Sequence, residues 1–233
     1  MIKEAIVLAG GLGTRLGGVI KDIPKPMAPI GEKPFLEFIL DYLNFSEIKR
    51  IVISVGYKKE VIINYFANSY KNSEIIYSEE DTPLGTGGAI LKAFELIEGE
   101  RSFVLNGDTF FMISLKALYE FHIKKKAEIS IALKRNEFKD KRYGNVLVSE
   151  EGKIINFEEK SNESALFNGG VYLINKRVFS NLNFPSKFSF EKDFLEKKVN
   201  EFDIFGKAFN NYFIDIGIPE DYEKAKREIS KFA

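Results

Sequence analysis

The chain contains no cysteine and no tryptophan, and its only histidine is His122. Without cysteine there is no disulfide framework, no thiolate metal site and no cysteine nucleophile. His122 stands beside Phe121 and Ile123 on an expected helix, so we interpret it as structural or exposed rather than catalytic. The sequence therefore offers neither a cysteine nucleophile nor a Ser-His-Asp set.

The sequence also lacks an excess of charge and a long apolar run. Lysine plus arginine and aspartate plus glutamate both number 34, so no global field favours nucleic acid or an anionic membrane, and we expect neither as a partner. No apolar run approaches the ~20 residues of a membrane span. The amino terminus enters a strand within a few residues without a signal peptide, so we expect a cytoplasmic protein.

What is present in the first half is an alternation of strands and helices. We predict strands over 5–9, 51–55, 74–77 and 102–106, and helices over 34–43, 60–66 and 87–97. Parallel strands need crossover connections, so this alternation indicates a mainly parallel sheet with helices on both faces.

From about residue 128 the pattern changes to hairpins. We predict strands over 128–134, 144–149, 153–159, 166–174 and 212–216, and helices over 176–182, over 190–199 and after Pro219. The length of 233 residues suits a single α/β domain. The expected fold is a Rossmann-like three-layer sandwich with a mixed, mainly parallel central sheet and a small β-hairpin subdomain, divided into parts of about 1–127 and 128–233.

A glycine-rich stretch, Leu-Ala-Gly-Gly-Leu-Gly-Thr-Arg-Leu, follows the first strand over residues 8–16. Glycines let the backbone turn tightly and bring its amides against an anion. Lys25 stands between Pro24 and Pro26, whose fixed φ angles should keep that segment extended. We predict a polyphosphate site with Arg15 and Lys25 as its catalytic cations and with these nucleotide contacts: Leu8, Gly10, Gly11, Gly13 and Thr14.

Two other glycine-rich motifs, the P-loop and the dinucleotide-binding fingerprint, are excluded because residues that they require are missing. No Gly-Lys-Ser/Thr follows the glycines, as a P-loop requires. A dinucleotide fingerprint would place its third glycine at Arg15-Leu16 and an acidic residue after the second strand, where 55–58 reads Val-Gly-Tyr-Lys.

Two aspartates close predicted strands. Asp108 follows Asn106-Gly107, and Asp215 lies in the segment Ile-Asp-Ile-Gly-Ile-Pro. In open parallel sheets, ligands bind outside the carboxyl ends of the strands. Beside a polyphosphate, carboxylates suit Mg²⁺, so we predict Asp108 and Asp215 as its ligands and Gly107 as a further nucleotide contact.

The string over 8–16, together with Pro-Lys-Pro-Met-Ala-Pro-Ile over 24–30 and Lys-Pro-Phe-Leu over 33–36, resembles the signature of the sugar-1-phosphate nucleotidylyltransferases. The resemblance extends over residues 4 to about 225. Within that family these strings most resemble the D-glycero-α-D-manno-heptose 1-phosphate guanylyltransferases, which implies GTP and the heptose 1-phosphate as substrates and GDP-heptose for bacterial surface polysaccharide as product.

The resemblance also implies roles for later residues. Segment 79–89 is similar to the family's base-recognition loop, which implies nucleotide contacts at Gly85, Thr86, Gly87 and Gly88. Later segments match the family's sugar-1-phosphate pocket in order and rough spacing, which implies sugar-phosphate contacts at Gly144, Glu159, Lys160, Asn168 and Gly169. The same family places Mg²⁺ on aspartates in segments like those of Asp108 and Asp215.

Nucleotidyl transfer brings two anions together, so its main problem is charge repulsion. We expect Arg15 to stabilise the departing phosphates, Lys25 the α-phosphate and Lys160 the incoming phosphate, in a direct attack without a covalent enzyme intermediate.

Other readings stay open. One is a uridylyl- or thymidylyltransferase acting on a hexose or N-acetylmuramate 1-phosphate, although Gly-Gly-Val-Ile over 17–20 departs from many such enzymes. Another is a non-catalytic relative that senses sugar nucleotides. The sequence also leaves a homodimer open as the oligomeric state.

Overall fold

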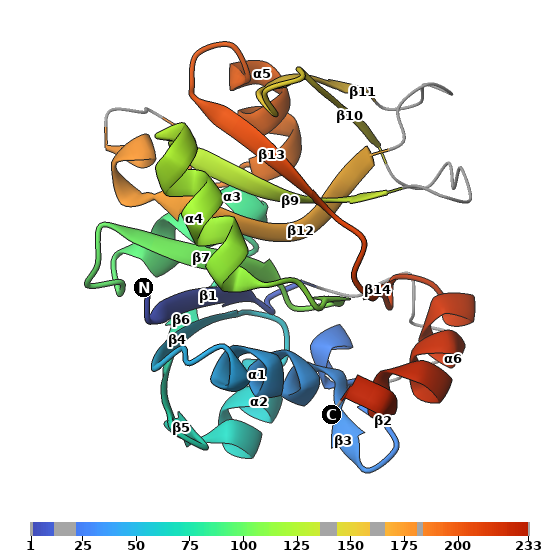
Figure 1. The fold of residues 1–233 in the computed structure, drawn as a ribbon. Helices are drawn as coiled ribbons and strands as arrows, with labels where there is room; N and C mark the ends of the chain where they lie inside the picture. The colour runs from blue at the N-terminus through green and yellow to red at the C-terminus, as the bar shows by residue number, and fades with distance from the viewer. Residues whose placement is uncertain (1, 12–21, 136–143, 159–165, 181–183, 233) are drawn as a thin grey trace.

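A computed structural model describes residues 2–11, 22–135, 144–158, 166–180 and 184–232. Among these residues, ten strands form one continuous sheet, with eight of them in the order β11-β10-β12-β7-β1-β4-β6-β5 (Figure 1). The two remaining strands, β9 and β13, branch from β12. The sheet therefore passes through both halves of the chain without a break.

The amino-terminal half supplies the parallel centre of the sheet. Strand β1 (Glu4–Leu8) lies between β7 (Arg101–Asn106) and β4 (Arg50–Val55), and β4 pairs with β6 (Ser73–Glu79). These four strands were predicted from their apolar runs. Their carboxyl ends meet at one edge, where Gly10, Gly11 and Asn106 lie.

The carboxy-terminal half is mostly antiparallel. Strand β12 (Leu166–Asn175) pairs antiparallel with β7 and with β9 (Ile129–Arg135), and β13 (Ile204–Phe209) runs parallel to β9. The predicted hairpin, β10 (Asn145–Val148) and β11 (Ile154–Glu158), joins β12 at the pair Asn145 and Phe167. The sheet is mixed, as predicted, and the hairpin belongs to it.

Strand β13 was not predicted. Its sequence, Ile-Phe-Gly-Lys-Ala-Phe, has glycine and lysine at its centre and no run of β-branched residues. A Cβ on Gly206 would lie 2.4 Å from Leu133 Cδ1, so the glycine lets β13 approach β9. The strand depends on this tertiary contact, which a local pattern does not reveal.

Short strands complete the structure. A hairpin forms between β2 (Pro29–Ile30) and β3 (Lys33–Pro34), and β5 (Ser69–Tyr70) adds to the edge of β6. Strands β8 (Thr109–Phe111) and β14 (Phe213–Asp215) pair antiparallel, with Asp215 opposite Thr109. This small ladder brings the ends of two distant segments together beside the main sheet.

The helices cover both faces of the sheet, as predicted. One apolar core packs α1 (Phe35–Phe45), α2 (Lys59–Phe66), α4 (Leu115–Lys125) and α6 (Pro219–Glu228) against the sheet. The opposite core packs α3 (Gly85–Phe94) and the π-helix η4 (Phe190–Leu195), which continues into α5 (Glu196–Lys198). Side chains of β1 alternate between these cores, since Ala5 and Val7 face the first and Ile6 the second.

Two segments differ from their predicted conformation. The segment Lys25–Met27 (η2) is a 3₁₀ turn rather than extended, because Met27 N donates to Pro24 O (2.8 Å) and Ala28 N donates to Lys25 O (3.0 Å). Proline is tolerated in a first turn because no N–H is needed there. The predicted helix over 176–182 is a 3₁₀ turn over Lys176–Phe179 (η3) in the part described.

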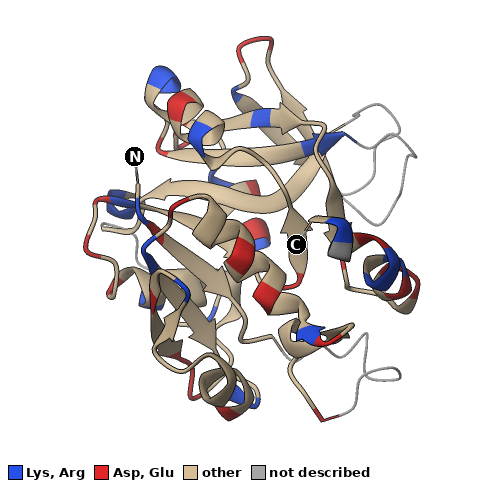
Figure 2. Ribbon diagram, turned by 60° about the horizontal axis from the view of Figure 1, so that its bottom comes forward, with Lys and Arg blue, Asp and Glu red and all other residues tan. Residues whose placement is uncertain are grey.

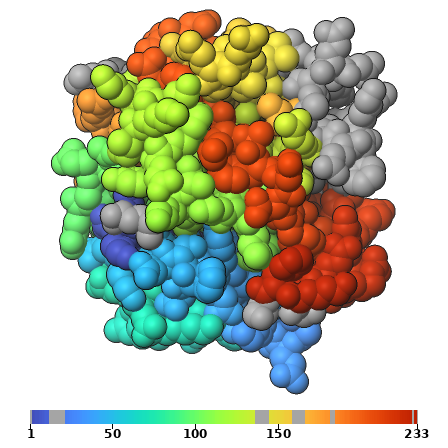
Figure 3. All heavy atoms as spheres, viewed as in Figure 1, coloured from blue at the N-terminus to red at the C-terminus, as the bar shows by residue number. Residues whose placement is uncertain are grey.

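The carboxy-terminal residues pack against the amino-terminal third of the chain, which Figure 3 shows as red atoms against blue ones. Tyr222 of α6 is buried and donates from Oη to Pro29 O at 2.6 Å. The last turn, η5 (Ile229–Phe232), follows α6 directly. Helix α6 thus supports the segment that leads from Lys25 into α1.

Acidic and basic residues are interspersed over the elements in Figure 2, which agrees with the balanced composition. In the described part of the chain, the structure contains no helix with the length and apolar character needed to cross a membrane.

His122 is buried between α4 and the sheet. Its Nδ1 lies 2.9 Å from Ser130 Oγ and its Nε2 lies 3.2 Å from Asn175 Oδ1. Asn175 in turn donates from Nδ2 to Ala127 O at 3.0 Å. Burial lowers the pKa of His122 to about 4, so the ring stays neutral near neutral pH.

This environment predicts a loss of stability in mild acid. In the unfolded chain His122 has a pKa of about 6.5, so as the pH falls protons bind the unfolded state first and folding weakens. Between about pH 7 and about pH 5 we expect this residue to remove about 1 to 2 kcal/mol from the free energy of unfolding. Urea unfolding of the wild type and of His122→Gln at both pH values tests this. An equal pH dependence in both proteins would contradict it.

Candidate active site

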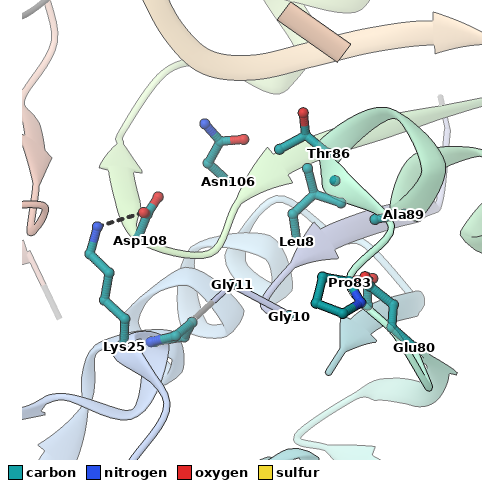
Figure 4. A pocket seen from close by; sticks show the side chains of 13 residues that line it. Leu8, Gly10, Gly11, Lys25, Glu80, Pro83, Thr86, Ala89, Asn106 and Asp108 are labelled. Carbon is teal, nitrogen blue, oxygen red and sulfur yellow. Dashed lines mark hydrogen bonds and ion pairs between the residues drawn. The ribbon is translucent and has the colours of Figure 1, made fainter. Parts of the chain in front are cut away.

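Two cavities open side by side at the carboxyl edge of the parallel strands. The first, here the glycine-loop cavity, has a volume of about 390 Å³ (Figure 4). Its lining residues come from strand ends, loops, the η2 turn and the start of α3 in the amino-terminal half: Leu8, Gly10, Gly11, Lys25, Pro26, Ser54, Glu80, Pro83, Gly85, Thr86, Ala89, Asn106 and Asp108.

The second, here the β12 cavity, has a volume of about 310 Å³. It is lined mainly by the carboxy-terminal half: Asn106, Thr109, Gly144, Asn145, Val146, Phe157, Asn168, Gly169, Gly170, Tyr172, Glu191, Glu196, Phe213 and Asp215. Asn106 lines both cavities, so they adjoin at this residue.

Lys25 and the two predicted aspartates meet where the cavities adjoin. Lys25 Nζ lies 2.6 Å from Asp108 Oδ2 and 3.7 Å from Asp215 Oδ1, and Figure 4 shows Lys25 extending toward Asp108. The Lys25 side chain is only 9% exposed. Ile216 N donates to Asp108 O at 3.0 Å and extends the β8–β14 ladder, which holds the aspartates side by side.

Gly107 is packed tightly between two strand ends. Its N–H donates to Leu8 O at 2.9 Å, and a Cβ at this position would lie 2.6 Å from the same oxygen. Gly107 is not among the described residues that line the glycine-loop cavity. The structure thus provides a packing reason for this glycine, whereas the predicted nucleotide contact stays a prediction.

The predicted base loop divides into two parts. Gly85 and Thr86 line the glycine-loop cavity, and α3 begins at Gly85 rather than at Gly87 as predicted. Gly87 and Gly88 pack against the segment 186–188 instead. A Cβ on Gly87 would lie 2.1 Å from the Phe188 ring, and one on Gly88 would lie 2.3 Å from Ser186 O.

Glu80 and Ser54 line the glycine-loop cavity and were not predicted as individual site residues. Ser54 Oγ donates to Glu80 Oε1 at 2.9 Å, and Leu84 N donates to Glu80 Oε2 at 2.9 Å. These bonds fix the carboxylate at the cavity wall. Glu80 lies within the loop that the resemblance marked, but Ser54 belongs to an apolar strand and carries no sequence signal.

Asn168 and Gly169 lie in the wall of the β12 cavity together with Gly144. Gly170 N donates to Asn168 Oδ1 at 3.0 Å, and Asn168 Nδ2 donates to Tyr172 Oη at 2.8 Å. The β12 register shifts between Asn168 and Tyr172, and Gly170 has a φ of +71° there. This irregularity turns the polar side chains of an otherwise buried strand toward the cavity.

Five predicted site residues lie outside the described residues. Gly13, Thr14 and Arg15 belong to the segment 12–21, and Glu159 and Lys160 to the segment 159–165. Their predicted roles stay predictions.

Comparison with known proteins matches residues 4–231 to the nucleotidyl transferase family. A D-glycero-α-D-manno-heptose 1-phosphate guanylyltransferase of Aneurinibacillus thermoaerophilus is 48% identical over 231 residues, with 98% of this chain and 99% of the relative covered. One from Campylobacter jejuni is 48% identical over 221 residues, with 94% and 96% covered. The crystal structure of HddC from Yersinia pseudotuberculosis superposes with a TM-score of 0.86 at 36% identity, covering 100% of both chains.

The packing of α3 generates a prediction about stability. In Gly87→Ala the new methyl group must displace the buried Phe188 ring, so we expect the free energy of unfolding to fall by about 1 to 3 kcal/mol. Gly11→Ala serves as the matched control, because a Cβ there meets none of the described residues within 4 Å and we expect a change below about 0.5 kcal/mol. Thermal and urea unfolding of both variants tests this, and equal stabilities would show that segment 186–188 does not restrain α3.

Proposed function

This chain belongs to the nucleotidyl transferase family, and from that premise we propose that it transfers GMP from GTP to D-glycero-α-D-manno-heptose 1-phosphate. The products are GDP-heptose, a donor for bacterial surface polysaccharide, and pyrophosphate. The observation that carries the proposal is the junction of two cavities at Lys25, Asp108 and Asp215. Near full-length identity to two guanylyltransferases for this heptose phosphate supports the substrate pair. Because GTP is a cytoplasmic nucleotide, we place the reaction in the cytoplasm.

We assign GTP to the glycine-loop cavity and the sugar phosphate to the β12 cavity. The lining of the first lies within 8–108, and that of the second lies mostly within 144–215. This distribution supports a single domain whose part of about 1–127 binds nucleotide and whose part of about 128–233 binds sugar phosphate.

In the proposed mechanism a sugar-phosphate oxygen attacks the α-phosphorus of GTP directly, and the bond to pyrophosphate breaks. The attacking group is already ionised, so no general base is needed, and the protein's task is to offset repulsion between the two anions. Lys25 lies where the α-phosphate and the attacking phosphate would meet. Arg15 and Lys160 are assigned to the departing and incoming phosphates, respectively.

Nucleotidyl transferases of this family generally use a divalent metal ion. Here two carboxylates converge on one buried ammonium group, so these three described side chains together carry a net negative charge that suits a further cation. Mg²⁺ is commonly held by one or two carboxylates together with substrate phosphates and water. We propose that Asp108 and Asp215 hold Mg²⁺, which would neutralise charge on both substrates.

The glycine-loop cavity also contains a group that suits guanine. The Glu80 carboxylate accepts hydrogen bonds and donates none, and guanine presents two adjacent donors, N1–H and the N2 amino group. Uracil and thymine present a single N–H between two carbonyl oxygens. A carboxylate facing this edge would be repelled by those carbonyl oxygens. We therefore propose Glu80 as a contact that favours GTP over UTP and dTTP.

The proposed activity is tested by pyrophosphate release with Mg²⁺ across nucleoside triphosphates and sugar 1-phosphates. We expect release with GTP and the heptose 1-phosphate, and a loss of about 10²-fold or more in kcat for Asp108→Asn and Asp215→Asn. Asp203→Asn, at a surface pair with Lys153, is the matched control. Release only with UTP or dTTP and a hexose phosphate would overturn the substrate pair. No release from folded protein that binds sugar nucleotides would favour a sensing role.

Glu80→Gln tests the base contact. An amide offers one acceptor and one donor in place of the carboxylate, so we expect kcat/KM with GTP to fall by about 10-fold or more relative to UTP. Glu74→Gln, at the opposite end of β6 and paired with Arg50, should leave the ratio of the two nucleotides unchanged. An unchanged ratio in Glu80→Gln would show that another group selects the base.

A further inference from the structure

The carboxylate of Glu191 lies between the two cavities. Its Oε2 accepts hydrogen bonds from Thr86 Oγ1 at 2.6 Å and from Ser189 Oγ at 3.2 Å, and its Oε1 accepts one from Tyr172 Oη at 3.3 Å. Thr86 lines the glycine-loop cavity, whereas Tyr172 and Glu191 line the β12 cavity. One side chain therefore connects the walls of both.

The direction of each hydrogen bond in this connection is fixed. Gly170 N can only donate, so it takes Asn168 Oδ1 and leaves Asn168 Nδ2 to donate to Tyr172 Oη. Tyr172 must then use its own proton to bond Glu191. Burial raises the pKa of the Tyr172 phenol well above its usual range, so the hydroxyl keeps this proton.

The other side of the connection is ordered in the same way. Phe190 N donates to Thr86 Oγ1 at 2.9 Å, so the Thr86 proton is directed to Glu191. An ionised carboxylate has no proton to donate and accepts both hydroxyls at once. In the hydrogen-bonded series Thr86–Glu191–Tyr172–Asn168, each bond thus has one donor direction, and Glu191 accepts from both sides.

The surrounding backbone makes this connection stiff. Phe188 N donates to Leu84 O and Gly87 N donates to Phe188 O, each at 3.0 Å, so the segment before Glu191 is docked along the start of α3. Glu191 itself lies in the π-helix η4, a conformation that is rare and often found at functional sites. Backbone hydrogen bonds and the Glu191 carboxylate thus both join the start of α3 to the segment that contains η4.

We propose that Glu191 is a positioning residue that couples the two cavities. Nucleotide bound against Thr86 restrains the start of α3, and through Glu191 and Tyr172 this restraint holds the Asn168 amide in the orientation that takes the sugar phosphate. The inference rests on the proposed function, because it assigns a nucleotide to one cavity and a sugar phosphate to the other. Coupling of this kind is reciprocal, so each substrate tightens the binding of the other by the same factor.

Three variants separate this role from a purely structural one. Glu191→Gln keeps the shape but turns one acceptor oxygen into an amide N–H, so a hydroxyl that donated to that oxygen must instead accept, and the fixed order of donors is lost. Thr86→Val removes the hydroxyl at the other end, and Thr86→Ser restores it. Asp193→Asn is the matched control, since Asp193 lies in the same helix but bonds Ser189 N and Lys197 Nζ.

In the experiment, the heptose 1-phosphate is titrated into the protein in a calorimeter in the presence of Mg²⁺. The titration is done with and without an α,β-imido GTP analogue that cannot be cleaved. We expect the analogue to tighten sugar-phosphate binding about tenfold in the wild type, in Thr86→Ser and in Asp193→Asn. In Glu191→Gln and Thr86→Val the ratio should approach one, and the KM for sugar phosphate should rise about tenfold with a smaller change in kcat.

The outcomes distinguish the two proposals. If the wild type releases pyrophosphate but shows no coupling, or if Glu191→Gln keeps the wild-type ratio, the role of Glu191 is overturned and the proposed function stands. If Asp193→Asn loses coupling as fully as Glu191→Gln, the effect belongs to the integrity of η4 and the inference fails. If the wild type uses a different nucleoside triphosphate and sugar phosphate, the proposed function is overturned. The same titrations with those substrates then test whether Glu191 couples the two cavities.

Discussion

The ion pairs of Lys25 with Asp108 and Asp215 are the interaction on which the remainder of the structure depends. A lysine that is 9% exposed is costly unless it is paired, and its two partners come from segments that lie far apart in the chain. The η2 turn must present the lysine, the end of β7 must present one aspartate, and the β8–β14 ladder must present the other. Helix α6 supports this arrangement from outside through the bond from Tyr222 to Pro29.

Local sequence patterns predicted the parallel strands of the sheet and the positions of the two aspartates. Apolar runs such as Ala5–Ala9 predicted the parallel strands, and strand ends predicted where the aspartates lie. Strand β13 was missed because its glycine is explained only by contact with Leu133. The flanking prolines did not predict the 3₁₀ turn at Lys25, because proline fixes its own φ angle and that φ also fits the first turn of a helix. Ser54 and Glu191 escaped notice because their roles arise from neighbours that folding brings together.

Glycines serve two different purposes around the same cavity. Gly11 lines it, and a Cβ there would meet none of the described residues within 4 Å. Gly87 and Gly88 face away from it, and their missing side chains let α3 press against the segment that carries η4. A glycine-rich motif therefore indicates that the backbone lies close to something. Only the structure shows whether the neighbour is a ligand cavity or another part of the protein.

Among the described residues, the β10–β11 hairpin pairs with β12 at Asn145 and Phe167, and its turn is held to β13 by Gly206 N, which donates to Gly152 O at 2.8 Å. The hairpin contributes part of the wall of the β12 cavity. By contrast, β12 pairs with β7 over five consecutive positions and so belongs firmly to the central sheet. The hairpin is thus attached at its base and at its turn, away from the strand end that presents Asp108. If the β12 cavity takes the sugar phosphate as proposed, substitutions in this hairpin would change which sugar is accepted while the junction at Lys25 stays in place.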